Sequence, residues 1–240
     1  MKHAPLSNMA LCLNLIEELQ NLPSYLPRMG GFFGKSGIGK TVAAGYASGQ
    51  SDAIFIRATS TINQKWFLKQ LLIEVGVPKP KGTLAELTTL LNNRLLESRR
   101  PLIIDEADYI IKKSFIDLIR DLHDGSEVPI LLIGEEYLSD HLEMWERFHN
   151  RMKFVPASLP TSTDILTLRD FYQRDGVHIA DDLALFFADQ VDGSIRRLAM
   201  NLHEATERSL REGWDTVDRG KWGGAPVMTG KVDHTRRLAA

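Results

Sequence analysis

The sequence predicts an α/β protein whose parallel sheet is covered by helices on both faces and is followed by a small helical domain. Short apolar strands alternate with amphipathic helical segments as far as about residue 159, an order typical of a parallel sheet. Beyond that point we expect helices and no further strand. We therefore expect an α/β domain at 1–159, a small helical domain, called the lid below, at 160–214, and a basic, flexible tail at 215–240.

Pattern breaks and caps define the elements of the first domain. Pro23 and Pro27 end the first helix, and the capping-box pair Thr83 and Glu86 begins a later one. Two prolines and a glycine make 77–82 a loop. In chain order we expect a helix over 9–22, a strand at 31–33, a helix over 41–48, a strand at 53–57, helices over 64–75 and 83–97, a strand at 101–105, a helix over 115–122 and a strand at 129–133.

The lid is expected to contain three helices, over 164–174, 181–191 and 195–211. The tail that follows has five basic residues from Arg219 onward against Asp233 alone, and its Gly-Gly-Ala-Pro stretch does not support regular structure. It is either an irregular end or a flexible arm for DNA or a protein partner.

The composition is that of an ordinary globular protein, with 43% hydrophobic and 25% charged residues. The net charge of −2 does not favour a nucleic-acid binder but leaves room for a local basic patch. A single cysteine, Cys12, excludes an internal disulfide. No apolar run approaches the roughly 18 residues that cross a bilayer, and no signal peptide is recognisable, so we expect a cytoplasmic protein without membrane contact.

A phosphate-binding loop is the strongest motif in the chain. The pattern G-x-x-x-x-G-K-[ST] is complete and lies between an apolar strand and a helix, the context that gives it meaning. Its residues are Gly34, Lys35, Ser36, Gly37, Ile38, Gly39, Lys40 and Thr41. Glycines let backbone N–H groups surround phosphate oxygens, Lys40 reaches the terminal phosphates, and the Thr41 hydroxyl ligates Mg²⁺. We expect ATP with Mg²⁺ as the ligand.

An acidic pair follows the strand at 101–105. Asp105 is expected to hold Mg²⁺ through its hydration shell, and Glu106 to polarise water for attack on the γ-phosphate. The alternative is a solvated acidic turn that opens the next helix, and we interpret Asp108 as such a helix-start residue. Glu135, after the strand at 129–133, is either a sensor of the γ-phosphate or an acidic residue at a helix N-terminus.

Three arginines are candidates for contacts to ATP. Arg151 is the first candidate for stabilising the transferring phosphoryl group in a neighbouring subunit, and Arg147 is the second. Ordinary surface arginines are the competing interpretation. Arg196 lies at the start of a helix, where a cation is unfavourable unless a polyphosphate binds there.

Together these residues resemble the AAA+ ATPases, and within them the transposition group: the target-capture B proteins of Mu-like phages and related transposon-encoded ATP-binding regulators. The resemblance extends over roughly 9–210. It is carried by the phosphate loop, Asp105-Glu106-Ala107-Asp108, Leu131–Gly134, the Arg151 segment and Gly193-Ser-Ile-Arg196-Arg197. Asn or Thr is commoner than Glu at the position of Glu135.

The resemblance implies an ATP-dependent oligomer, helical or ring-like, on duplex DNA. Such an assembly delivers target DNA to a transposase and stimulates it, and hydrolysis times its release. Backbone contacts to DNA are expected from Arg57, Thr59, Lys65 and Lys69, which follow the strand at 53–57. A solvated loop and helix face is the alternative for these residues.

Two other functions stay open. One is a different nucleic-acid ATPase, such as a helicase loader, and the other is a protein-directed ATP switch of the secretion-assembly type. A small-molecule kinase is disfavoured, because it does not need the paired acidic strand with downstream arginines.

Overall fold

The computed structural model describes residues 4–23, 25–113 and 115–230, and these residues form two compact units. The first unit comprises Asn8–Ser36 and Lys40–Ser158. The second contains residues 4–7, 37–39 and 159–230. The division after Ser158 lies next to the boundary expected at 159/160.

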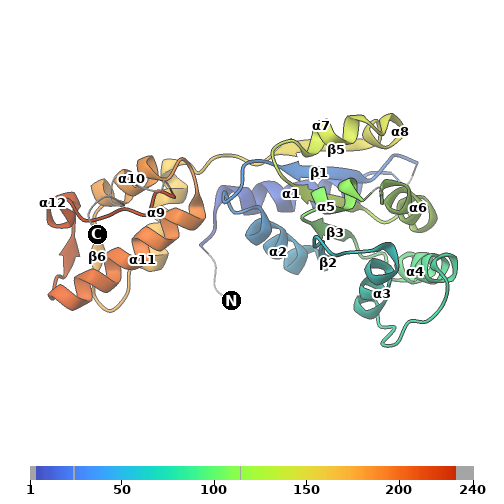
Figure 1. Cartoon of the computed structure of the whole chain (residues 1–240), viewed down its shortest axis with the longest axis horizontal. Helices are drawn as coiled ribbons and strands as arrows, with labels where there is room; N and C mark the ends of the chain where they lie inside the picture. The colour runs from blue at the N-terminus through green and yellow to red at the C-terminus, as the bar shows by residue number, and fades with distance from the viewer. Residues whose placement is uncertain (1–3, 24, 114, 231–240) are drawn as a thin grey trace, which may run out of the picture. The chain divides into compact units, whose positions relative to one another are not determined.

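A five-stranded parallel sheet forms the centre of the first unit, with the strand order β2-β3-β4-β1-β5 (Figure 1). The strands are β1 (Met29–Phe33), β2 (Ile54–Arg57), β3 (Leu102–Asp105), β4 (Ile130–Gly134) and β5 (Met152–Pro156). Every residue of β3 and β4 is buried, as a sheet covered on both faces requires. Strand β5 was not expected, because this edge strand is only partly buried and lacks an apolar run.

Alternate residues of the strands face two separate apolar cores. Ile103 and Leu131 pack with α1 (Ser7–Asn21) and α2 (Lys40–Ser51) on one face. Leu102 and Leu132 pack with helices on the other face. These helices are α3 (Gln64–Glu74), α4 (Leu84–Ser98), α5 (Asp108–Lys112), α6 (Ile116–Ser126), α7 (Leu138–Glu143) and α8 (Glu146–His149). The period of two along a strand therefore explains the layered arrangement.

The predicted capping box of α4 is confirmed. The Thr83 N–H donates to Glu86 Oε2 at 2.7 Å, and the Glu86 N–H donates to Thr83 Oγ1 at 3.3 Å. The two bonds satisfy backbone donors that the first turn of a helix otherwise leaves without partners.

The second unit is built from α9 (Ser162–Tyr172), α10 (Asp181–Gln190) and α11 (Ile195–Glu212). The short strands β6 (His178–Ile179) and β7 (Thr216–Val217) pair in parallel, so the expectation of no strand after 159 is not met. Two-residue strands leave no recognisable period in the sequence.

The tail expected at 215–240 is ordered where the structure describes it. Val217 and Trp222 are buried in the core of the second unit, and Trp222 is the last residue of α12 (Arg219–Trp222). The guanidinium groups of Arg208 and Arg219 lie over the rings of Trp222 and Phe186. Apolar burial and cation–π contacts therefore outweigh the basic, glycine-containing composition. Residues 231–240 of the expected tail lie outside the described residues. Over the described ranges, no helix is both long and apolar enough to cross a bilayer.

Candidate nucleotide-binding site

The phosphate loop joins β1 to α2 at the carboxyl ends of the parallel strands. Gly37 and Gly39 adopt φ values of +86° and +94°, a region in which a side chain is strained. Helix α2 begins at Lys40, so its free backbone N–H groups and positive dipole end adjoin the loop. This local arrangement is the anion-binding geometry that the motif predicts.

Lys40 folds over its own loop. Its Nζ donates to the carbonyl oxygens of Gly34 and Lys35 at 2.6 and 2.7 Å. Burial lowers the pKa of Lys40, while four carboxylates act in the opposite direction: Glu135, Glu106, Asp108 and Asp105. The acidic residues of two chain segments, 105–108 and the start of the loop after β4, thus act on one ammonium group, a surplus of negative charge that a divalent cation would offset.

Asp105 ends β3 and is buried, with 3% of its surface exposed. Its Oδ1 accepts the Glu106 N–H at 3.0 Å, and among the described residues Oδ2 has no hydrogen-bond donor. Burial raises the pKa of Asp105, and interactions with Thr41, Glu106 N–H and Arg57 lower it less strongly. A buried carboxylate oxygen without a donor, beside a hydroxyl, suits Mg²⁺, which prefers oxygen ligands. Thr41 and Asp105 would hold that ion.

Glu106 stands directly after β3 with φ at +57°, a left-handed conformation that is uncommon for a residue with a side chain. Such a backbone costs on the order of 1–3 kcal/mol; elsewhere in the chain it occurs at helix ends such as Arg99 and Glu127, whereas Glu106 adopts it directly after a strand of the site. Asp105 and Glu106 therefore combine a buried carboxylate with one whose side chain is 37% exposed. The buried carboxylate of Asp105 suits a metal ligand, and the more exposed carboxylate of Glu106 suits a group that acts on water.

Arg57 joins these groups. Its Nε lies 3.4 Å from Asp105 Oδ2, and its Nη2 lies 3.3 Å from Glu106 Oε1 and 3.4 Å from Thr41 Oγ1. The register of β2 on β3 pairs Arg57 with Asp105, so the two strands end together. We expected Arg57 at DNA, whereas the structure places its guanidinium on the carboxylates of the site. Sequence spacing did not reveal this position, because it depends on which strands are neighbours.

Asp108 does more than begin α5. It is buried, and its Oδ2 accepts the backbone N–H of Glu135 at 2.8 Å. A Cβ at Gly134 would lie 2.8 Å from the same oxygen, so a glycine leaves room for this contact. The side chain of Glu135 is exposed. Asp108 therefore fixes the backbone from which Glu135 projects, a role that sequence analysis missed.

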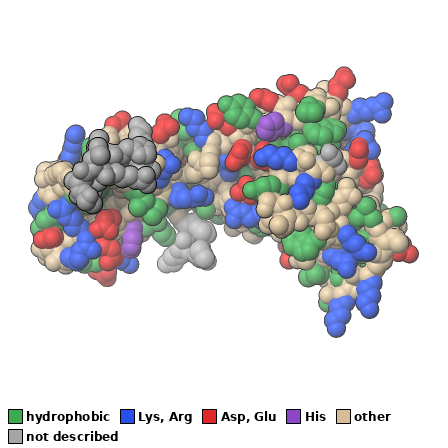
Figure 2. All heavy atoms as spheres, in the orientation of Figure 1, with side chains coloured by type: hydrophobic (Ala, Val, Ile, Leu, Met, Phe, Trp, Pro, Cys, Tyr) green, Lys and Arg blue, Asp and Glu red, His purple; other side chains and the backbone are tan. Residues whose placement is uncertain are grey.

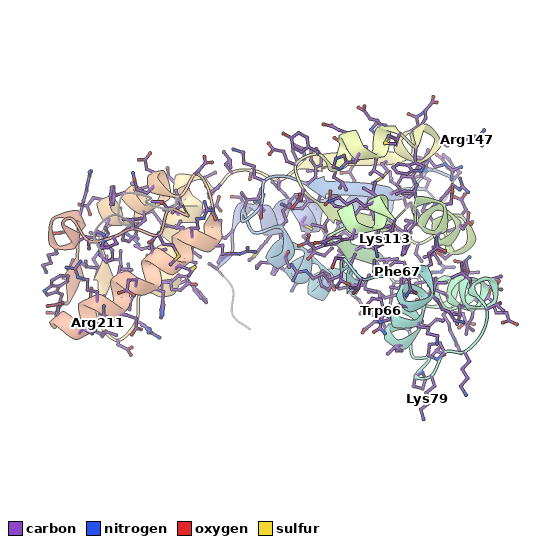
Figure 3. All side chains as sticks on the ribbon, viewed as in Figure 1. Trp66, Phe67, Lys79, Lys113, Arg147 and Arg211 are labelled. Carbon is purple, nitrogen blue, oxygen red and sulfur yellow. The ribbon has the colours of Figure 1, made fainter. Side chains whose placement is uncertain are left out.

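Arg151 lies away from the phosphate loop of its own chain. It directly precedes β5, at the amino end of that strand, whereas the loop and Asp105 follow the carboxyl ends of β1 and β3. Its Nη1 donates to both carboxylate oxygens of Asp124 at 2.7 and 3.0 Å. The exposed Arg147 is on α8 near the same edge (Figure 3). Neither arginine is placed to act on the nucleotide of its own chain.

Arg196 belongs to the second unit, in the first turn of α11, and its side chain is exposed. The Ser194 Oγ caps this helix by accepting the Arg197 N–H at 3.4 Å. The cap fixes the start of α11 and leaves the Arg196 guanidinium free to turn toward solvent.

Comparisons with known proteins agree with this geometry. A family model described as "AAA domain" matches residues 24–142. Among solved structures, the chain is similar to the crystal structure of Cdc6p from Pyrobaculum aerophilum, with a TM-score of 0.65 and 17% sequence identity. That similarity covers 90% of this chain and 66% of that one, and at this identity it concerns the fold. No curated protein matches the sequence.

The sheet order, the phosphate loop, the acidic end of β3 and the matched domain all point to the same class. The chain has the AAA+ P-loop NTPase fold, with an AAA domain at 24–142.

Proposed function

We propose that this AAA+ ATPase oligomerises on duplex DNA with little sequence preference, delivers that DNA to a transposase, and activates the transposase. The observation that carries the proposal is Arg57, whose guanidinium joins Asp105, Glu106 and Thr41 at the end of β2. The chain segment that leaves the site at this point contains the candidate DNA ligands. ATP and DNA would therefore act on one continuous piece of chain.

The chemistry assigns one task to each group of the site. Backbone N–H groups of the loop and Lys40 bind the phosphates, while Thr41 and Asp105 hold Mg²⁺. The ion, when bound, neutralises charge on the phosphate oxygens. Glu106 accepts a proton from the attacking water, and Glu135 orients that water or responds to the γ-phosphate.

Arg57 is positioned to control Glu106. A guanidinium that contacts a carboxylate restricts its direction, so Glu106 is less free to turn toward the attacking water while the pair with Arg57 persists. A phosphate bound to the segment that follows β2 would compete for Arg57 or shift it. Hydrolysis would then respond to DNA.

DNA contacts are assigned to the hydroxyl of Thr59 and to the ammonium groups of Lys65 and Lys69. Lys65 is exposed and Lys69 half-buried on α3, while Thr59 lies in the preceding loop. Hydroxyls and ammonium groups commonly contact phosphate oxygens, and such contacts carry no sequence information, which favours sequence-tolerant binding.

Self-assembly is supported by the position of Arg151 at the amino end of β5, whereas Lys40 lies at the carboxyl ends of the strands. A neighbouring subunit that presents the amino end of β5 to the nucleotide would supply the arginine that the site needs. Arg196, from the second unit, is the candidate for a further phosphate contact.

The test measures the ATPase rate and sedimentation with and without duplex DNA over a salt series. We expect DNA to raise the rate and to drive assembly with ATP, and both effects to weaken steeply as salt rises. An ATPase rate and a sedimentation coefficient that ignore DNA at low salt would refute the DNA-directed function. Strand transfer by a purified transposase, with and without the ATPase, tests the delivery step. A rate of strand transfer that does not depend on the ATPase would leave a nucleic-acid ATPase of another kind, such as a helicase loader.

A further inference from the structure

Helix α3 exposes a large aromatic side chain on its first turn. Trp66 is 41% exposed, whereas its neighbour Phe67 is fully buried and packs on Phe115 with ring centroids 6.4 Å apart. Both residues are labelled in Figure 3. The Trp66 N–H donates to Asn63 Oδ1 at 2.9 Å, so the N-terminal cap fixes the backbone that carries the indole. The core is complete without Trp66, and its exposed face has no role in the packing described above.

Three lysines lie around this turn. Lys69 follows Trp66 by three residues on α3, which places it next to the indole on the helix surface, and the exposed Lys65 directly precedes Trp66 in the same turn. The third, Lys113, comes from the segment after α5, and its Nζ donates to the carbonyl oxygen of Ile62 at 2.9 Å. Tertiary structure therefore adds a cation that the spacing in the sequence does not reveal.

Positive charge predominates at the start of the helix. The N-terminus of α3 already has a positive dipole end, and Lys113 is held one residue before the cap. Glu86 is an acidic residue that interacts electrostatically with Lys65, and its carboxylate already accepts hydrogen bonds from Thr83. Further along, the α3–α4 loop adds the exposed Lys79 and Lys81 (Figures 2 and 3). Like charges at a positive helix end repel one another unless an anion binds there.

We propose that Trp66 contacts the bases or sugars of bound DNA, while Lys65, Lys69 and Lys113 contact the phosphates on either side of it. Duplex DNA fits an indole set among ammonium groups, because an apolar ring can pack on sugars or insert between base steps while the ammonium groups neutralise the phosphates. The proposal rests on the DNA-directed function above and adds to it an aromatic contact that tolerates any base sequence.

The experiment measures the affinity of the full chain, with ATP, for a labelled random-sequence duplex by fluorescence anisotropy. Trp66→Ala should weaken binding about ten-fold, as expected when a large apolar side chain no longer becomes buried on binding. Trp66→Phe, which keeps a ring, should retain most of the affinity. Leu96→Ala is the matched control, since Leu96 is 50% exposed on α4 and we assign no contact to it.

Salt dependence separates the two kinds of contact. The slope of log affinity against log salt should stay unchanged in Trp66→Ala, because no phosphate contact is lost. The slope should fall by about one in each of Lys65→Ala, Lys69→Ala and Lys113→Ala. The thermal unfolding midpoint of each variant checks that the chain is folded.

The outcomes distinguish the two proposals. If the lysine variants weaken binding but Trp66→Ala binds DNA like the wild type, the aromatic contact is refuted and the DNA-directed function stands. If Trp66→Ala binds DNA normally but loses self-assembly, Trp66 contacts protein and the inference is overturned. If the wild type does not bind DNA at low salt, the proposed function itself fails.

Discussion

At the scale of single residues, the site combines a buried acidic residue, an acidic residue with an unfavourable backbone conformation, and an arginine that contacts both. Asp105 has lost most of its water, Glu106 adopts a left-handed backbone, and Arg57 contacts both. Each of these features is unfavourable or neutral for an isolated domain and becomes useful when Mg²⁺ and phosphate enter. Two predictions follow from this combination.

Arg57→Ala should raise the DNA-free ATPase rate several-fold and bring the ratio of DNA-stimulated to DNA-free rates toward one. Without the guanidinium, Glu106 is free to act as a base in the absence of DNA. The ratio is measured with saturating ATP in steady-state assays, and Arg57→Lys serves as the control that keeps the charge. A variant that loses hydrolysis but keeps nucleotide affinity would instead make Arg57 a group required for the reaction.

Asp105→Asn should stabilise the ligand-free protein at neutral pH. Burial raises the pKa of Asp105 in the folded state, so the folded protein binds this proton more tightly than the unfolded chain. The charged form therefore destabilises the fold above that pKa, and the penalty disappears as pH falls through it. We expect the melting temperature to rise by roughly 2–4 °C, as about 1 kcal/mol would give in a chain of this size. Calorimetry over a pH series should show the difference from wild type shrinking on acidification, and a constant difference would contradict the burial argument.

At the scale of secondary structure, packing decides where local propensity is weak. Strand β5 and the segment from β7 to α12 have little regular pattern of their own, yet both join larger structures. Strand β5 gains hydrogen bonds along one edge of β1, and α12 gains a buried tryptophan. Neighbours supply the free energy that these short segments lack.

Trp222→Ala should therefore destabilise the second unit by about 3–5 kcal/mol, the usual cost of removing a large buried aromatic side chain. The side chain is 2% exposed, packs on Phe187 and lies under the Arg208 guanidinium. Chemical denaturation measures the change, and Trp214→Ala is a milder control because that side chain is only partly buried. An unfolding free energy equal to that of the wild type would support a flexible tail after all.

At the scale of the whole molecule, the groups for hydrolysis are divided between the carboxyl and amino ends of the strands of one sheet. Lys40, Asp105 and Glu106 gather at the carboxyl ends of the strands, and Arg151 lies at the amino end of β5. Within one chain, the rigid strands of a parallel sheet hold their amino ends apart from their carboxyl ends. Completion of the site from a second copy is the arrangement that this geometry favours.

Mixing two inactive variants tests that arrangement. Arg151→Ala should keep its own Glu106 but lose the arginine that it offers to a neighbour, and Glu106→Gln should have the opposite defect. Equimolar mixing should restore about a quarter of the interfaces in a randomly mixed oligomer. Steady-state ATPase assays at increasing total concentration measure the rescue. A mixture no more active than its components would show that Arg151 does not act between subunits.

The sequence by itself determined the α/β class, the phosphate loop, the acidic end of β3 and the capping box of α4. Each of these is a local pattern whose chemistry is complete within a few residues. Only the tertiary structure decided that Arg57 meets Asp105 and Glu106, that Asp108 holds Glu135, that Lys113 joins the lysines of α3, and that Trp222 is buried. These contacts join segments far apart in the chain, and they depend on strand order, register and packing. Such long-range choices are settled by the free energy of the whole fold and leave no period or motif in the local sequence.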